Sequence, residues 1–192
     1  SVVSTDHETR PLSEHLAASP KLSWLMMRLD AIRRRDEKVI VFTEFRDLQR
    51  LIQRAVAERF GYAAQIINGS TAVDAQSEHS RQRLIDRFQA EKGFGVIILS
   101  TTAVGFGVNI QAANHVVHFT RPWNPAKEDQ ATDRAYRIGQ SKDVFVYCPT
   151  LVGNGFESFE ERLAKLLEGK RDLSRDMLSG VQEVTAEDFV DL

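Results

Sequence analysis

Two arginines and a glutamine occur at helical spacing in the stretch QATDRAYRIGQ, residues 130 to 140. Gln130 is followed by Arg134 four positions later and by Arg137 three positions after that, so a helix would hold all three on one face. A guanidinium group is a planar fork of N–H donors that suits phosphate oxygens. The stretch therefore indicates a site for multiply charged anions. The alternative is a solvated helix face on which Asp133 and Arg137 form an ordinary surface ion pair.

The sequence also contains signals for both ends of this helix. Asn124 is a favourable N-cap, and Pro125 suits the first helical position because proline has no N–H to donate there. Gly139 follows as a typical C-terminal stop. We therefore expect one rigid helix that presents the glutamine and both arginines together.

Short apolar runs alternate with amphipathic stretches along the chain. Strands are expected at residues 39–42, 63–67, 96–99, 115–119 and 143–147. Helices are expected to open at Ser19-Pro20, to cover residues 48–56, 84–88 and 125–138, and to run from Phe156 towards Leu178. This alternation predicts an α/β fold with a mainly parallel sheet and helices on both of its faces.

Polar loops follow four of the predicted strands, and parallel strands bring such loops to the carboxyl edge of a sheet, where ligands bind. The loops are Thr43-Glu44-Phe45, residues 68–71, residues 100–110 and residues 120–125. Their hydroxyl and backbone N–H groups are typical donors to nucleic-acid phosphates and need no net positive charge. Any one loop could be an ordinary turn, but four at one edge favour a binding site.

Three other patterns in the sequence could form binding sites. Gly105-Phe106-Gly107 could begin a dinucleotide-binding loop, but Ile110 stands where a third small residue is required. His115 and His118 are three apart in a strand, so they face opposite sides and cannot share a metal ion. We therefore expect no metal site. Trp123 could stack on a base, although we favour packing of its loop onto the sheet.

Composition limits the function classes. With 192 residues and 42% hydrophobic content, the chain can bury one sizeable core. A net charge of −2 gives no global attraction to polyanions, so any nucleic-acid contact must be local. Cys148 is the single cysteine, which suits a reducing compartment. No apolar run of membrane-spanning length and no signal pattern occurs, so a cytoplasmic or nuclear location is expected.

Several segments together resemble a known family. The segments KVIVFTEF, INGST, RLIDRF, STTAVGFGVNIQAANHVVHFTRPWNP and QATDRAYRIGQ resemble, in this order and spacing, the second RecA-like lobe of Swi/Snf-type ATPases in helicase superfamily two. SFEERLAKLLEGKRDL resembles the helix that follows this lobe. The resemblance implies a three-layer α/β/α fold with a long C-terminal helix. It divides the chain into a lead-in at 1–18, a lobe at 19–150, a helical extension at 151–180 and an acidic tail at 181–192.

The resemblance also implies roles for individual residues. Gln130, Arg134 and Arg137 would meet the ATP phosphates as catalytic residues, and the two arginines would act as arginine fingers. Three residues of the fifth family motif would face the nucleotide, namely Gly105, Gly107 and Asn109. Contacts to DNA are expected from Thr43, Asn68, Gly69, Ser70, Thr101, Thr102 and Trp123.

The sequence lacks the phosphate-cradling loop that a nucleoside triphosphatase needs, because its single Gly-Lys pair, Gly169-Lys170, precedes Arg171 rather than Ser or Thr. ATP and Mg²⁺ are therefore expected to be bound mainly by an N-terminal RecA-like lobe outside these residues, and this chain alone is expected to be inactive. The expected function is the C-terminal motor lobe of an ATP-dependent translocase on double-stranded DNA, without membrane contact. A strand-separating RNA or DNA helicase lobe and an inert RecA-like scaffold are the alternatives.

Overall fold

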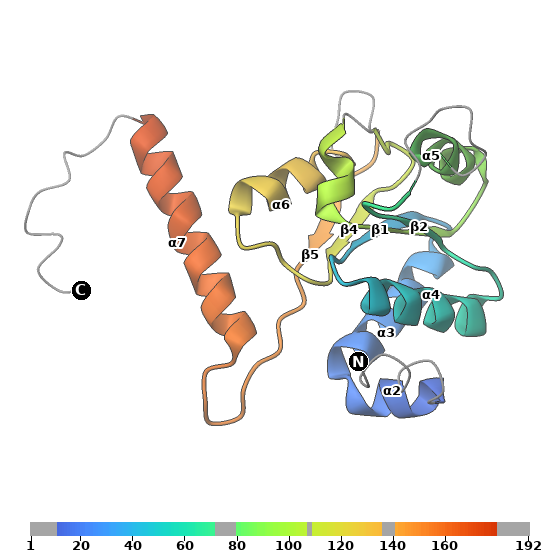
Figure 1. Ribbon diagram of the computed structural model, residues 1–192, viewed down its shortest axis with the longest axis horizontal. Coiled ribbons are helices and arrows are strands. Elements are labelled where there is room, and N and C mark those ends of the chain that lie inside the picture. Colours follow the sequence, from blue (N-terminus) through green and yellow to red (C-terminus); the bar gives the residue numbers. More distant parts are fainter. Residues whose placement is uncertain (1–10, 72–79, 107–108, 136–140, 180–192) are drawn as a thin grey trace, which may run out of the picture.

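The computed structural model describes residues 11–71, 80–106, 109–135 and 141–179. A five-stranded sheet in which all neighbouring strands are parallel forms its centre (Figure 1). The strands are β1 Lys38–Phe42, β2 Gln65–Ile67, β3 Gly95–Leu99, β4 His115–His118 and β5 Phe145–Tyr147. Their order across the sheet is β2-β3-β1-β4-β5. All five lie at the predicted apolar runs, so the predicted α/β fold with its parallel sheet is confirmed.

Helices cover both faces of the sheet, which gives the three layers of a RecA-like fold. They are α2 Leu12–Ala18, α3 Pro20–Arg34, α4 Arg46–Phe60, α5 Arg81–Ala90, the 3₁₀ helix η1 Thr101–Phe106, α6 Pro125–Thr132 and α7 Phe159–Ser179. Alternate residues of a strand point to opposite faces. Accordingly, Val39 and Val41 of β1 pack with α3 and α4, whereas Ile40 and Phe42 pack with α5 and α6.

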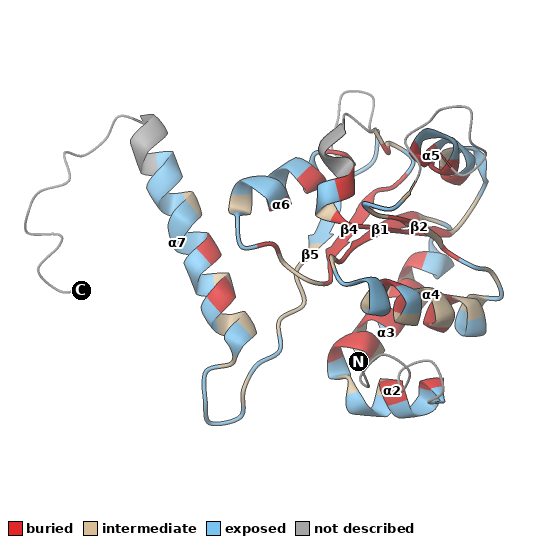
Figure 2. Ribbon diagram, in the orientation of Figure 1, coloured by how far each residue is buried: buried red, intermediate tan, exposed pale blue. Residues whose placement is uncertain are grey.

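The central strands are apolar because both of their faces are covered. Every residue of β1 and β3 is buried, and Figure 2 shows the buried colour concentrated in the sheet and on the inner faces of its helices. Local signals set the helix ends. Ser19 Oγ accepts a hydrogen bond from the backbone N–H of Leu22 at 3.2 Å, and Gly61 ends α4 at a φ of 81°.

Helix α6 is shorter than expected, because it ends at Thr132 rather than near Gly139. Residues 133–135 form a turn in which the N–H of Arg134 bonds to the carbonyl of Ala131 at 3.2 Å, a tighter i→i−3 pattern. The hydroxyl of Thr132 donates to the carbonyl of Glu128 at 3.0 Å and contacts His118 Nε2 at 2.8 Å. Such back-bonding weakens a helix locally, so the predicted continuous helix is wrong here.

Two further elements complete the fold. The expected lead-in contains helix α2, whose Leu12 is buried against the core, so residues 12–18 are more ordered than their irregular pattern indicated. Helix α7 is largely exposed apart from Leu163 and Leu167 (Figure 2). None of the helices in the described part of the chain combines the length and apolar character needed to span a bilayer.

Candidate functional site

The loops after β1 and β4 are bonded to each other at the carboxyl edge of the sheet. The N–H of Phe119 donates to the carbonyl of Phe42 at 2.9 Å, and the hydroxyl of Thr120 donates to Thr43 Oγ1 at 3.1 Å. The side chain of Thr43 is fully buried in this arrangement. Thr43 therefore supports the edge from inside, contrary to the expectation that its hydroxyl is available to DNA.

The loop after β3 joins the same edge through Glu44. The N–H of Thr101 donates to Glu44 Oε1 at 2.5 Å, and the Thr101 hydroxyl donates to the same oxygen. The hydroxyl of Thr102 reaches Glu44 Oε2 at 3.4 Å and Ser100 Oγ at 3.1 Å. The two predicted hydroxyls are thus brought together, but a carboxylate that our sequence reasoning did not assign holds them. Its signal in the sequence is an acidic residue between Thr43 and Phe45, directly after the apolar run of the first strand.

The loop after β2 lies beside these residues and is held by Asn68. Its Oδ1 accepts from the N–H of Ser70 at 3.0 Å and from the Ser70 hydroxyl at 2.6 Å. Its Nδ2 donates to Gln49 Oε1 at 2.8 Å, and Gln49 is itself buried. The Asn68 side chain is therefore committed to shaping the loop. Gly69 and Ser70 are the exposed members of this predicted contact.

Arg134 is the described member of the predicted arginine pair, and it does not protrude. Its side chain is 9% exposed, and its Nε has no hydrogen-bond partner. The carbonyl of Arg134 accepts from the N–H of Ile110 at 3.0 Å, which ties the turn after α6 to the loop after η1. In that loop Asn109 Oδ1 is also buried without a partner. Gln130, by contrast, is exposed on α6, so the three predicted side chains do not share one exposed stripe.

Arg137 and Gly107 lie outside the described residues, and Gly105 lies within η1. Of the residues predicted to face the nucleotide, the structure describes Asn109 and the backbone of Gly105 in η1.

An ion cluster centred on the buried Glu128 supports α6 from the side of the C-terminal helix. Arg121 makes a two-point contact with Glu128, with both N···O distances at 2.8 Å. Arg171 of α7 contacts Glu128 Oε1 at 2.8 Å and Asp129 Oδ1 at 2.6 Å. Burial acts to raise the pKa of the Glu128 carboxyl, but hydrogen bonds from both arginines outweigh it and the net shift of the pKa is downward. This cluster joins residues far apart in the sequence, so spacing alone did not reveal it.

The two histidines of β4 point to opposite faces, as predicted. His115 contacts Glu37 Oε2 at 2.7 Å and Tyr147 Oη at 3.2 Å. His118 stacks on Phe42 on the other face, and burial lowers the pKa of His118 to about 4. Among the described residues, no group of three or more metal-ligating side chains comes together.

Trp123 is 64% exposed and packs against Phe159 of α7, with ring centroids 5.4 Å apart. The packing of Trp123 onto the sheet, which we favoured, is therefore wrong. Its ring borders a cavity of about 280 Å³ that Lys21, Phe45 and Thr120 also line. This cavity lies next to the edge that carries Glu44, because Thr120 Oγ1 accepts from the N–H of Glu44 at 3.2 Å.

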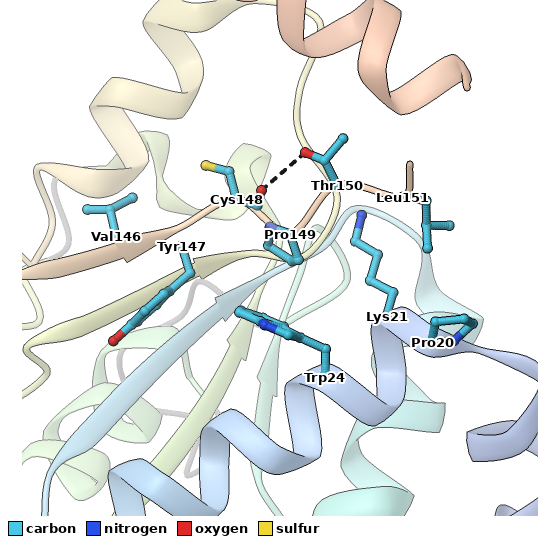
Figure 3. A pocket seen from close by; sticks show the side chains of 9 residues that line it. All are labelled: Pro20, Lys21, Trp24, Val146, Tyr147, Cys148, Pro149, Thr150 and Leu151. Carbon is cyan, nitrogen blue, oxygen red and sulfur yellow. Dashed lines mark hydrogen bonds between the residues drawn. The ribbon is translucent and has the colours of Figure 1, made fainter. Parts of the chain in front are cut away.

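A second groove, of about 440 Å³, lies between α3 and the segment after β5 (Figure 3). Trp24 and Tyr147 form its walls, and Lys21 and Cys148 lie along it. Burial raises the pKa of the Cys148 thiol, so the thiol stays in its protonated, unreactive form at neutral pH. The groove is separate from the residues that the sequence singled out.

Comparisons with known proteins extend this picture. The family model of the helicase conserved C-terminal domain matches residues 21–139. The Zorya protein ZorD of Escherichia coli is 60% identical over 172 residues, which are 89% of this chain and 16% of that protein. The ATP-dependent helicase FUN30 of Saccharomyces cerevisiae is 37% identical over 136 residues, 71% of this chain and 11% of that protein.

Solved structures agree with these relatives. The structure of the C-terminal part of the Fun30 ATPase domain matches with a TM-score of 0.67 at 30% identity. The match covers 91% of this chain and 49% of the Fun30 chain. The Sulfolobus solfataricus SWI2/SNF2 ATPase core in complex with dsDNA has a TM-score of 0.62 at 32% identity and covers 88% of this chain and 34% of that one. The chain thus spans less than a fifth of the two curated relatives and no more than half of these solved chains.

Proposed function

We propose a motor role for this chain, which belongs to the helicase conserved C-terminal domain family as the second RecA-like lobe of a Swi/Snf-type ATPase of helicase superfamily two. In this proposal the lobe supplies arginine fingers and DNA contacts to an ATP-dependent translocase on double-stranded DNA. An N-terminal RecA-like lobe binds most of the ATP and its Mg²⁺. An ATP-dependent relative supports the assignment of ATP, and the neighbour solved with dsDNA supports the assignment of DNA.

The single observation that carries the proposal is that Arg134 Nε is buried without a hydrogen-bond partner. A guanidinium Nε that is buried without an acceptor is unfavourable, because it has given up water and gained no hydrogen bond. An oxygen of a bound triphosphate would provide such an acceptor once the lobes close and the side chain turns towards it. The bond between Ile110 and Arg134 then links that turn to the loop of Asn109, whose Oδ1 is also unsatisfied.

ATP, when bound, supplies the phosphoryl group whose transfer to water drives the cycle. The residues of this chain would orient and stabilise that transfer rather than hold the nucleotide. Arginine fingers contribute on the order of 10³–10⁵ to the rate of such reactions. Arg134 and Arg137 are assigned that role, and Gln130, exposed on α6, is assigned a place beside them.

Contacts to DNA are assigned to the donors at the carboxyl edge. The N–H and hydroxyl of Thr101 and the hydroxyl of Thr102 are near one another, since all bond to one carboxylate. Gly69, Ser70 and Trp123 are exposed on neighbouring loops. Hydroxyls and backbone N–H groups of this kind hold a phosphate backbone without reading its sequence. Such contacts suit a motor that moves along DNA of any sequence.

The test replaces Arg134 with alanine in the intact two-lobed ATPase. We expect DNA-stimulated ATP hydrolysis to fall at least about a hundredfold, while binding of ATP persists because the other lobe holds it. Arg83→Ala is the matched control, since Arg83 is an exposed arginine on α5. Near-normal hydrolysis in the Arg134 variant would refute the finger assignment. Efficient unwinding in a strand-displacement assay would favour the strand-separating alternative over translocation on the duplex.

A further inference from the structure

A carboxylate occupies the donors that the proposed function assigns to DNA. Glu44 Oε1 accepts from both the N–H and the hydroxyl of Thr101, and Glu44 Oε2 accepts from Thr102. Glu44 lies 57 residues before Thr101, so this contact is tertiary rather than local. A carboxylate and a phosphate oxygen are both anionic acceptors that seek the same charge-assisted hydrogen bonds.

The two anions cannot occupy this position together. The backbone of Thr101 has a single N–H, and the short N···O distance of 2.5 Å shows that Glu44 uses it. A phosphate next to the unmoved carboxylate would also face a like charge at close range, in a partly buried setting where water screens it incompletely. No lysine or arginine among the described residues forms an ion pair with Glu44 to offset that charge.

The Glu44 side chain is able to leave without disturbing the core. The backbone of Glu44 is fixed, because its N–H donates to Thr120 Oγ1 and because the preceding residue, Thr43, is fully buried. The side chain itself is only half-buried, and Phe45 after it is 65% exposed. Rotation about the side-chain bonds of Glu44 would therefore release Thr101 and Thr102 while the strand and the start of α4 stay in place.

We propose that Glu44 is an intramolecular competitor for the DNA phosphate, whose carboxylate lowers the affinity of this lobe for DNA. The inference rests on the proposed DNA contacts of Thr101 and Thr102. In the absence of DNA, the carboxylate keeps the donors hydrogen-bonded and ordered. When DNA binds, a phosphate replaces it, and the carboxylate turns to solvent. The affinity of the lobe for DNA is thereby set below what the donors alone would give.

The test measures the affinity of the 192-residue chain for a fluorescent DNA duplex, with Glu44→Gln as the main variant. Glutamine keeps the shape and one acceptor oxygen but removes the charge. We expect the Kd to fall about two- to fivefold, the range for losing one partly exposed charge contact. Asp47→Asn is the control, because Asp47 is an exposed carboxylate in the first turn of α4. Its effect on the Kd should be clearly smaller.

A purely structural role for Glu44 gives the opposite result. If the carboxylate only orders the loop, Glu44→Gln will leave the Kd unchanged or raise it, and Glu44→Ala will raise it further while the melting temperature drops. Either of these outcomes would refute the proposal that Glu44 competes with the DNA phosphate. A double-mutant cycle adds a second readout, since the gain from Glu44→Gln should shrink when Thr101→Val has already removed the hydroxyl.

The same experiment separates this inference from the proposed function. If Thr101→Val leaves the Kd for DNA unchanged, the assignment of Thr101 to DNA fails, and the competitor fails with it. If Thr101→Val weakens binding but Glu44→Gln does not strengthen it, only the competitor fails.

Discussion

Arg171 of the C-terminal helix reaches Glu128 of α6 across 2.8 Å, and through this contact α7 is attached to the helix that precedes Arg134. Arg171 also contacts Asp129 at 2.6 Å, and the hydrogen bonds that Arg171 donates to the Asp129 carboxylate raise the pKa of Arg171 above its ordinary value. Besides this pair, Leu163 and Leu167 are the buried apolar residues of the described part of α7. Lys21 of α3 also contacts Glu160 of α7 at 2.7 Å, so ion pairs at two points help to hold α7 in place.

Arg171→Ala is expected to destabilise the protein by about 1–2 kcal/mol, because Glu128 stays buried and keeps only Arg121 as its partner. Urea unfolding monitored by circular dichroism measures the change. Arg162→Ala is the control, since Arg162 is 72% exposed in its ion pair with Glu157 and should cost less than about 0.5 kcal/mol. Equal effects of the two variants would show that the buried pair contributes nothing special.

His118 should make the protein less stable as the pH falls. Its pKa is about 4 in the folded protein, below the value of about 6.5 expected when unfolded. The unfolded chain therefore binds this proton more readily, and stability is lost between about pH 6.5 and pH 4, by on the order of 3 kcal/mol in total. Denaturant titrations across this range in His118→Gln should show a weaker pH dependence. Some dependence should remain, because burial also lowers the pKa of His115.

Lys38 should act as a buried support for the end of α5. Its Nζ donates to the carbonyls of Phe88, Gln89 and Glu91, and burial lowers the pKa of Lys38. Lys38→Met would fill the same space but leave these carbonyls without a donor, at a cost of about 2–3 kcal/mol. Thermal and urea unfolding test this, with exposed Lys92→Met as the control. A variant as stable as the original chain would contradict the role.

The chain alone should hydrolyse almost no ATP. Our proposal places the phosphate-binding loop on another lobe, so activity requires that lobe to be present. Phosphate release should be measured for this chain, for a separately expressed N-terminal lobe, and for their mixture with duplex DNA. Activity should appear in the mixture and disappear again when the chain carries Arg134→Ala. Substantial turnover by the chain alone would show that the nucleotide site is assigned to the wrong place.

The sequence predicted the sheet well, for a physical reason. Strands such as β1 and β3 are buried on both faces, so they need continuous apolar runs that stand out from their surroundings. Predicting parallel strands also predicted that the polar loops meet at the carboxyl edge, because parallel strands all end there. The helix starts at Ser19 and Asn124 depend only on neighbouring residues, and these too were predicted from the sequence.

The remaining features depend on contacts between distant residues. Helix α6 ends early where Thr132 bonds to His118 and where Arg134 bonds to Ile110, and no local pattern reveals either contact. Helical spacing showed that Gln130 and Arg134 could share a face, but it did not show that one is exposed and the other buried. The carboxylate of Glu44 on Thr101 is likewise a tertiary contact.

The loops that carry the proposed DNA contacts follow β2, β3 and β4, and the sheet joins these strands through β1 in the order β2-β3-β1-β4. Neighbouring strands are separated by about 4.8 Å, a distance that their hydrogen bonds keep nearly constant. The distances between these loops are therefore fixed by the sheet. In the proposed translocase, a DNA strand bound at these loops would advance only when the whole lobe moves, so the movement between this lobe and the proposed N-terminal lobe would set the step length.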